Sequence, residues 1–252
     1  MAHRPAMFQA RAEGFSPVNA WWLSELCRLI YRKDTSEGVV GLGRASRNDF
    51  LARVGLVERH VFSGPATQAA LVETEEADEK AFAVLVFRGT TGRLSNWLYN
   101  LDMVASKWPV GGNVHRGFRN IIMKLWDPIA TVLEKIDKQL FFTGHSLGGA
   151  LATLAASLRP PCAVYTFGAP RIGDAAFAQT LAGVPVFNVF NPKDIVTGLP
   201  PVSQKTRFTH VGAIVRNIEV KSPRGSFAQA PSFLANHAPL NYTFQLPVDF
   251  DN

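Results

Sequence analysis

The sequence feature that most constrains the fold is an alternation of short apolar runs with segments of helical periodicity. Residues 81–87 (AFAVLVF) form an unbroken apolar run of strand length, which suggests burial on both faces. Helices and strands are then expected in turn: helix 116–138, strand 139–144, helix 146–158, strand 162–168, helix 173–183 and strand 184–191. Strand–helix–strand units repeated in this way predict an α/β fold, a mostly parallel sheet with helices on both faces.

The segment before this alternation predicts one helix and two more strands. Ser16 and Pro17 form a helix start, because proline is tolerated in the first helical turn. The apolar residues that follow recur at helical spacing: Trp21, Trp22, Leu26, Leu29 and Ile30. Residues 57–64 and 68–74 are strand candidates, and the acidic turn 73–80 leads from the second of them to the apolar run.

Length and composition fit one domain. A chain of 252 residues that is 47% hydrophobic can bury one large core and is short for two, so residues 1–252 are expected to form a single domain. No run reaches the roughly 18 to 20 apolar residues of a membrane-spanning helix. The N-terminus shows no export signal, so a cytoplasmic location is the default, with secretion through a removed signal left open. We expect a monomer.

Charge and cysteine usage argue against several classes of protein. The net charge of +6 is dispersed, with a basic segment at 28–33 and an acidic one at 73–80, which indicates a solvated surface and no nucleic-acid partner. Cys27 and Cys162 lack the spacing of a metal site or a disulfide scaffold, and we interpret both as buried small apolar groups. No metal-binding motif is present, and we expect no metal and no cofactor.

Residues 141–157 (FFTGHSLGGALATLAAS) contain the pattern G-x-S-x-G around Ser146. In a nucleophile elbow of this kind, the serine sits on a strained turn from strand to helix, at the carboxyl edge of the sheet. The bare pattern occurs by chance in about one chain in ten of this length. Here an apolar strand precedes it and a helix of small residues follows it, as in an α/β-hydrolase. We therefore predict that Ser146 is a nucleophile; the alternative is a simple helix cap.

A serine nucleophile requires a histidine as general base. In α/β-hydrolases the histidine comes last in the chain, after the serine and the acid. This order sets aside the histidines that precede the elbow, namely His3, His60 and His115. His145 lies inside the elbow, with its side chain expected to point away from the nucleophile. His237, in a polar loop, is preferred, and His210, in a strand-like alternation, stays open as the alternative.

Three acidic residues are candidates for the residue that orients the base. Asp174 precedes an alanine-rich helix, so it is expected to cap that helix. Glu219 alternates with apolar residues in a late strand and is expected on the surface. Asp194 is better placed than both, because it follows the strand at 184–191 and lies in a loop that its prolines make rigid.

Five segments recur in an order that is specific as a set: 86–90 (VFRGT), 114–118 (VHRGF), 143–156 (TGHSLGGALATLAA), 166–174 (TFGAPRIGD) and 191–201 (NPKDIVTGLPP). In order and spacing they resemble the fungal-type, class-three triacylglycerol lipases, which are α/β-hydrolases. The resemblance extends from about residue 21 to about residue 242. It implies Ser146 as nucleophile, Asp194 as acid and His237 as base. It also implies an oxyanion hole formed by Thr90, through its N–H and hydroxyl, and by the N–H of Leu147.

The segment 91–102 (TGRLSNWLYNLD) has two interpretations. Its apolar residues recur at the spacing of one helical face, which by periodicity alone favours a short core helix: Leu94, Trp97, Leu98 and Leu101. The resemblance to lipases instead implies a short helical lid at this position. On that interpretation, the apolar face covers Ser146 in water and turns outward at a lipid surface.

Together these features predict a serine carboxylester hydrolase, most simply a triacylglycerol lipase that acts on lipid esters at a lipid–water interface. An esterase for phospholipid, monoacylglycerol or feruloyl-type esters is the alternative, since the same elbow serves all of them. A more distant alternative is a lipid-binding module without catalysis. A substitution at one of the three triad positions would favour that alternative, and none is substituted.

Overall fold

The structure is a computed structural model and describes residues 4–32, 46–76, 78–90, 104–202, 207–217, 235–246 and 250–251. The strands are β1 (Arg4–Pro5), β2 (Leu56–Ser63), β3 (Gln68–Thr74), β4 (Phe82–Phe87), β5 (Ala105–Lys107), β6 (Asn113–His115), β7 (Gln139–His145), β8 (Ala163–Phe167), β9 (Val186–Phe190), β10 (Ala213–Asn217) and β11 (Phe250–Asp251). The helices are α1 (Pro17–Leu29), α2 (Arg47–Ala52), α4 (Arg116–Met123), α5 (Trp126–Leu133), α6 (Leu147–Leu158), α7 (Ala175–Gln179), the 3-10 helix η1 (Ile195–Gly198) and α9 (Pro239–Gln245).

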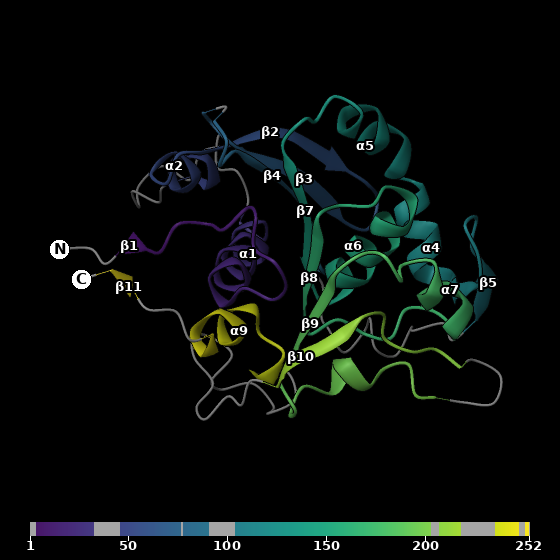
Figure 1. Ribbon diagram of the computed structural model, residues 1–252. Helices are drawn as coiled ribbons and strands as arrows, with labels where there is room; N and C mark the ends of the chain where they lie inside the picture. The colour runs from purple at the N-terminus through teal and green to yellow at the C-terminus, as the bar shows by residue number, and fades with distance from the viewer. Residues whose placement is uncertain are drawn as a thin grey trace.

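The central sheet is mostly parallel, as the sequence predicts. Its strands lie in the order β10-β9-β8-β7-β4-β3-β2, with parallel pairing from β10 to β4 and antiparallel pairing of β3 with both of its neighbours. Helices α1 and α9 lie on one face, and α4, α6 and α7 lie on the other (Figure 1). The carboxyl ends of β4, β7, β8 and β9 therefore meet at one edge, where Thr90, Ser146 and Asp194 follow their strands.

Buried side chains of the strands alternate between two cores, one on each face of the sheet. Along β4, Ala83, Leu85 and Phe87 belong to the core of α4 to α7, and Phe82, Val84 and Val86 belong to the core of α1, α2 and α9. All six are at most 7% exposed. Burying one such side chain contributes about 1.5 to 3 kcal/mol for the larger residues. The unbroken apolar run at 81–87 is thus a central strand covered on both faces, as predicted.

The predicted N-terminal helix is confirmed together with its start signal. The Ser16 hydroxyl accepts the N–H of Asn19 at 3.1 Å, and Pro17 is the first helical residue. Helix α1 packs against β7 and α9. Its residue Cys27 is buried, as predicted, with its sulfur 3.3 Å from the Thr143 hydroxyl, and this burial raises the pKa of the Cys27 thiol to about 12.

Two predictions about this part of the fold are wrong. The single helix expected at 116–138 is two helices, because α4 ends at Met123 and α5 begins at Trp126. Pro128 lacks an N–H, and in a continuous helix its ring would clash with the Lys124 carbonyl, so the second helix restarts just before the proline. Cys162 is exposed rather than buried, since it precedes β8 and its thiol lies 3.0 Å from Gln139 Oε1 at the strand's edge.

Some predicted features lie outside the residues that the structure describes. They are the expected lid residues Leu94, Trp97, Leu98 and Leu101, and the late-strand residue Glu219. Among the residues it does describe, no helix is long and apolar enough to cross a membrane. The helix expected at 173–183 is present but shorter, as α7.

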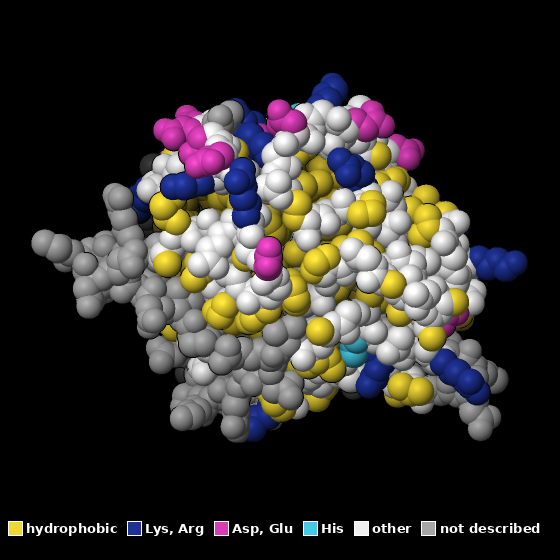
Figure 2. All heavy atoms as spheres, viewed as in Figure 1, with side chains coloured by type: hydrophobic (Ala, Val, Ile, Leu, Met, Phe, Trp, Pro, Cys, Tyr) yellow, Lys and Arg dark blue, Asp and Glu magenta, His cyan; other side chains and the backbone are white. Residues whose placement is uncertain are grey.

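Charged side chains of both signs occur together on the face of the molecule shown in Figure 2. They gather mainly along the edge where β2 and α5 lie, and hydrophobic and uncharged polar side chains occupy the centre of this face. One mixed cluster joins Glu73 to Lys138 at 3.0 Å and to Arg59 at 4.0 Å. The acidic residue at the end of β3 is therefore neutralised locally.

Helix α6 approaches the sheet through glycines. A Cβ at Gly148 would lie 2.8 Å from the carbonyl carbon of Phe87 on β4 and still nearer to its oxygen. A Cβ at Gly144 would meet the backbone of Gly148 in the same way. The two glycines of the G-x-S-x-G pattern therefore allow strand β7 to turn directly into a helix that touches β4.

We predict that Gly148→Ala destabilises the fold, because the new methyl group forces α6 away from β4. Overpacking of this kind costs about 1 to 3 kcal/mol, which lowers the midpoint of thermal unfolding by several degrees in a chain of this size. Circular dichroism melting curves measure the effect. Gly183→Ala is the matched control, since nothing lies within 4 Å of its added Cβ. Equal melting temperatures for both variants would contradict the close approach.

Candidate active site

Ser146 forms the sharp turn between β7 and α6. Its φ of 59° makes it the one non-glycine residue with a positive φ in the part of the chain that the structure describes, a backbone strain of about 1 to 3 kcal/mol. The N–H of Ser146 donates to the Phe167 carbonyl on β8 at 2.9 Å, which holds the turn against the sheet. Leu147 is the first residue of α6, so its N–H has no acceptor within the helix and carries the positive end of the helix dipole.

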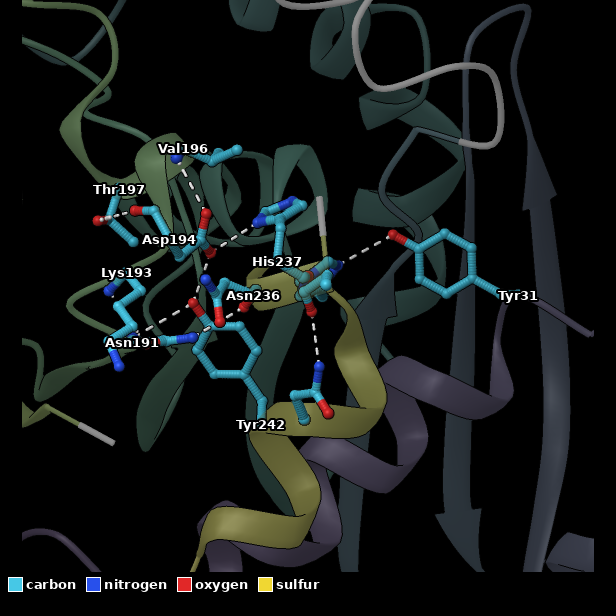
Figure 3. Close-up of polar contacts among 12 residues, drawn as sticks. Tyr31, Asn191, Lys193, Asp194, Val196, Thr197, Asn236, His237 and Tyr242 are labelled. Atoms are coloured by element: carbon cyan, nitrogen blue, oxygen red, sulfur yellow. Dashed lines mark hydrogen bonds and ion pairs between the residues drawn. The ribbon is translucent and has the colours of Figure 1, made fainter. Parts of the chain in front are cut away.

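Asp194 follows β9, and both of its carboxylate oxygens accept hydrogen bonds (Figure 3). Oδ1 accepts the N–H of Val196 at 3.0 Å. Oδ2 accepts from His237 Nδ1 and from the Tyr242 hydroxyl, each at 2.6 Å. Burial and the negative charge of Asp194 raise the pKa of Tyr242 well above its ordinary value, so the phenol stays protonated and donates. These contacts fix the carboxylate in one orientation.

The contact with Asp194 determines where His237 carries its proton. A carboxylate can only accept, so Nδ1 is the protonated nitrogen, and in the neutral ring Nε2 carries the lone pair. His237 is 4% exposed, and its Nε2 is buried with no hydrogen-bond partner. The ring is therefore held with an uncommitted basic nitrogen, which is the state that a general base requires.

His145 joins the serine turn to the loop of His237. Its Nε2 lies 2.7 Å from the backbone carbonyl oxygen of His237, and the centroids of the two rings are 4.5 Å apart. Burial, followed by the neighbouring His237, lowers the pKa of His145 well below its ordinary value. His145 is thus neutral, so a positive charge that develops on His237 is not repelled by a second charged imidazole.

Three buried side-chain atoms without hydrogen-bond partners belong to residues that the sequence analysis places in the site. They are Ser146 Oγ, His237 Nε2 and Thr90 Oγ1. Buried polar atoms in native proteins nearly always have partners, so each exception requires an explanation. Proton transfer from a nucleophile to a base, and donation to a developing oxyanion, would account for all three.

The structure separates the remaining candidates from this cluster. Asp174 caps α7 by accepting the N–H of Phe177 at 2.9 Å, as expected. His210 lies just before β10, and its Nε2 donates to the Thr197 carbonyl at 2.9 Å. Burial lowers the pKa of His210 to about 4. Thr197 in turn donates its hydroxyl to the Asp194 carbonyl at 2.8 Å, so His210 supports the loop of Asp194 from outside.

Sequence reasoning missed three residues of the site, namely Tyr31, His145 and Tyr242. Tyr31 comes just after α1, and its hydroxyl points toward the region of His237, whereas Tyr242 lies on α9 and its hydroxyl points toward Asp194 (Figure 3). Their contacts join residues far apart in the sequence, so no local pattern marks them. The one available signal was a histidine directly before Ser146.

Comparisons with known proteins give a consistent result. Residues 84–204 match the family model described as lipase (class 3). The chain is 34% identical to a lipase of Rhizomucor miehei over 153 residues, which is 54% of this chain and 41% of the relative. It is 31% identical to a chloroplastic phospholipase A(1) of Arabidopsis thaliana over 156 residues, which is 49% of this chain and 35% of the relative.

A solved structure of a fungal lipase–inhibitor complex, presented as a model for interfacial activation in lipases, is similar with a TM-score of 0.64 and 26% identity. The similarity covers 82% of this chain and 81% of that one, and it confirms the α/β-hydrolase fold. The chain spans less than half the length of the curated relatives named above. The family match over residues 84–204 and these similarities show that the chain is similar to class 3 lipases.

Proposed function

We propose that the protein is a serine carboxylester hydrolase that acts on lipid esters, most simply a triacylglycerol lipase. The observation that carries the proposal is the buried Asp194–His237 pair, with Nδ1 and Oδ2 2.6 Å apart, which His145 links to the strained turn at Ser146. Ser146 Oγ and His237 Nε2, the two atoms that must exchange a proton, are buried and without partners. The similarity to proteins named lipases supports the same assignment.

In the proposed mechanism, His237 Nε2 takes the proton of Ser146 Oγ as that oxygen attacks the ester carbonyl carbon. The N–H groups of Thr90 and Leu147 stabilise the oxyanion, and removing one such donor typically costs about 3 to 4 kcal/mol. Asp194 stabilises the imidazolium. The imidazolium protonates the leaving alcohol, which departs and leaves an acyl group on Ser146. Water, activated by His237, then releases the acid and restores the serine.

The class of ester has one specific alternative. The relative from Arabidopsis thaliana is named a phospholipase A(1), which favours phospholipid esters as the second candidate. Monoacylglycerol and feruloyl-type esters use the same chemistry at the carbonyl. These classes differ in the groups beyond the carbonyl, so the shape of the cleft decides among them and the triad does not.

We predict that a fluorophosphonate probe labels Ser146 and that Ser146→Ala abolishes hydrolysis of both short-chain and long-chain chromogenic esters. Asp194→Asn should lower kcat by about 10⁴-fold, because the amide no longer fixes the tautomer of His237. Mass spectrometry of the labelled peptide and steady-state assays measure these effects.

Asp174→Asn is the matched control for Asp194→Asn. Asp174 is also a partly buried carboxylate that accepts hydrogen bonds, but its partners are on α7 and Asn113. It should change kcat by less than roughly twofold and act on stability instead, because the hydrogen bonds that it loses cap α7 and do not reach Asp194 or His237. Equal effects of the two aspartate substitutions would place the acid elsewhere. Full activity of Ser146→Ala would end the proposal.

The two late histidines give a further prediction. His237→Ala should lower kcat by about 10⁴-fold or more, whereas His210→Gln, which keeps a donor toward Thr197, should leave kcat nearly unchanged. The pKa of His210 is about 4 when folded and about 6.5 when unfolded. Only the unfolded state therefore binds its proton between these pH values, and stability falls as the pH drops from about 6.5 to 4.

Urea unfolding at several pH values measures this contribution. Relative to the wild type, His210→Gln should flatten the dependence of unfolding free energy on pH in that window, by at most about 1.4 kcal/mol per pH unit. Parallel curves for the two proteins, or a loss of kcat in His210→Gln that matches His237→Ala, would contradict the assignment of the two histidines.

The segment 91–102 is proposed as a lid over the site. It directly follows Thr90, and Leu94, Trp97, Leu98 and Leu101 recur at the spacing of one helical face. Exposing such a face to water costs about 25 cal/mol per Å² of apolar surface. At a lipid surface that cost largely disappears, so lipid shifts the population toward the open state. The relative described as a model for interfacial activation supports this proposal.

We predict that the hydrolysis rate rises abruptly when the substrate passes its solubility limit. Rate against concentration of an ester measured across that limit tests this directly. The jump should be smaller in a Trp97→Ser/Leu98→Ser variant, while that variant still hydrolyses a soluble short-chain ester. A smooth saturation curve, the same for both proteins, would make the segment a structural helix and the protein an esterase.

A further inference from the structure

Three consecutive backbone carbonyls hold the loop that carries His237. The Ala235 carbonyl accepts from Asn241 Nδ2 at 2.6 Å, and the Asn236 carbonyl accepts from Asn191 Nδ2 at 3.0 Å. The third carbonyl, that of His237 itself, accepts from His145 Nε2 at 2.7 Å. The donors of the first two hydrogen bonds lie on α9 and in the loop that carries Asp194. The third comes from the serine turn, and it is the one that sets His237 relative to Ser146.

The partners of His145 determine a single direction of hydrogen bonding. A carbonyl only accepts, so His145 carries its proton on Nε2, and in the neutral ring Nδ1 must then accept. The Tyr31 hydroxyl, 3.2 Å from Nδ1, is therefore the donor. The Tyr31 oxygen in turn accepts the backbone N–H of Gly89, a contact that partly offsets the effect of burial, which raises the pKa of Tyr31.

This chain of bonds touches the proposed mechanism at three places, each on a reacting residue or directly before one. Gly89 precedes Thr90, and His145 precedes Ser146. The third contact is with the backbone of His237. The approach is close, because a Cβ at Gly89 would lie 2.7 Å from the His145 carbonyl oxygen and 3.3 Å from Ser146 Cβ. The oxyanion segment, the nucleophile and the base thus share one buried polar connection.

We infer that Tyr31 and His145 are positioning residues. They fix the relative positions of the Gly89–Thr90 segment, the Ser146 turn and the His237 loop. The hydrogen bonds run from the Gly89 N–H to the Tyr31 hydroxyl, from that hydroxyl to His145, and from His145 to the His237 carbonyl. The inference rests on the proposed function. Neither residue touches the substrate. A displacement of about 1 Å between catalytic groups can lower a rate by about 10²-fold, so removing either bond should affect turnover more than substrate binding.

The experiment compares four variants with the wild type on a water-soluble short-chain ester. Tyr31→Phe removes the hydroxyl, and His145→Met removes both ring nitrogens while keeping the bulk. His145→Gln restores a donor near the position of Nε2. Tyr165→Phe is the matched control, because the Tyr165 hydroxyl is also buried and accepts a backbone N–H, but from Ser16 at the start of α1, at 3.1 Å, and not from a residue of the site.

The expected result is a split between kcat and KM. Tyr31→Phe and His145→Met should lower kcat by about 10- to 100-fold with KM within about twofold, and His145→Gln should recover a large part of that loss. The double variant Tyr31→Phe/His145→Met should be no slower than His145→Met alone, since both act through one chain. Tyr165→Phe should change the melting temperature and leave kcat as in the wild type.

A wild-type kcat in Tyr31→Phe, or multiplicative losses in the double variant, would overturn the inference while leaving the proposed function intact. Failure of the wild type itself to hydrolyse esters or to react with a fluorophosphonate would instead remove the proposed function and this inference together. A measurement independent of activity and of variant folding is the ¹⁵N spectrum of the wild-type imidazoles. It should show His145 protonated on Nε2 only, and protonation on Nδ1 would overturn the chain.

Discussion

The strained turn at Ser146 is the constraint on which the rest of the site depends. A positive φ in a serine costs about 1 to 3 kcal/mol, and the hydrogen bond from its N–H to the Phe167 carbonyl holds the backbone there. The turn also requires α6 to begin at once and to lie against β4, which only glycine at position 148 allows. Sheet packing therefore fixes the direction of the serine oxygen and places the N-terminus of α6 beside it.

Around this turn, the buried polar groups divide into those that are satisfied and those that are not. Asp194 accepts three hydrogen bonds, and the carbonyls of residues 235 to 237 each accept one from a buried side chain. These bonds rigidify Asp194 and the loop of His237. Three of the unpaired buried atoms are ones that the proposed chemistry would use, on Ser146, His237 and Thr90. Such a division is costly for stability alone and is explained by preorganisation for a reaction.

The sequence predicts the strands and the serine turn because both depend on local patterns. The apolar run at 81–87 indicates a buried strand, and the glycines beside Ser146 indicate a close approach of backbones. The break between α4 and α5 had a local cause too, Pro128, but the continuous helical periodicity on either side of it outweighed that signal. The prediction for Cys162 failed for a different reason. It used residue type alone, which favours burial, whereas the position of Cys162 just before a strand exposes it.

Local sequence patterns could not predict the two tyrosines that contact the site, because these contacts join residues far apart in the chain. Tyr31 contacts His145 across 114 positions of sequence, and Tyr242 contacts Asp194 across 48. In the sequence, each tyrosine is one more aromatic residue in or next to a helix. Only the fold places its hydroxyl beside a buried acceptor. The structure adds a test that a sequence cannot supply, the donor and acceptor count at each buried atom. Applied to His145, that count leaves one tautomer. In this tautomer, a residue set aside from the sequence becomes a link between the Ser146 turn and the loop of His237.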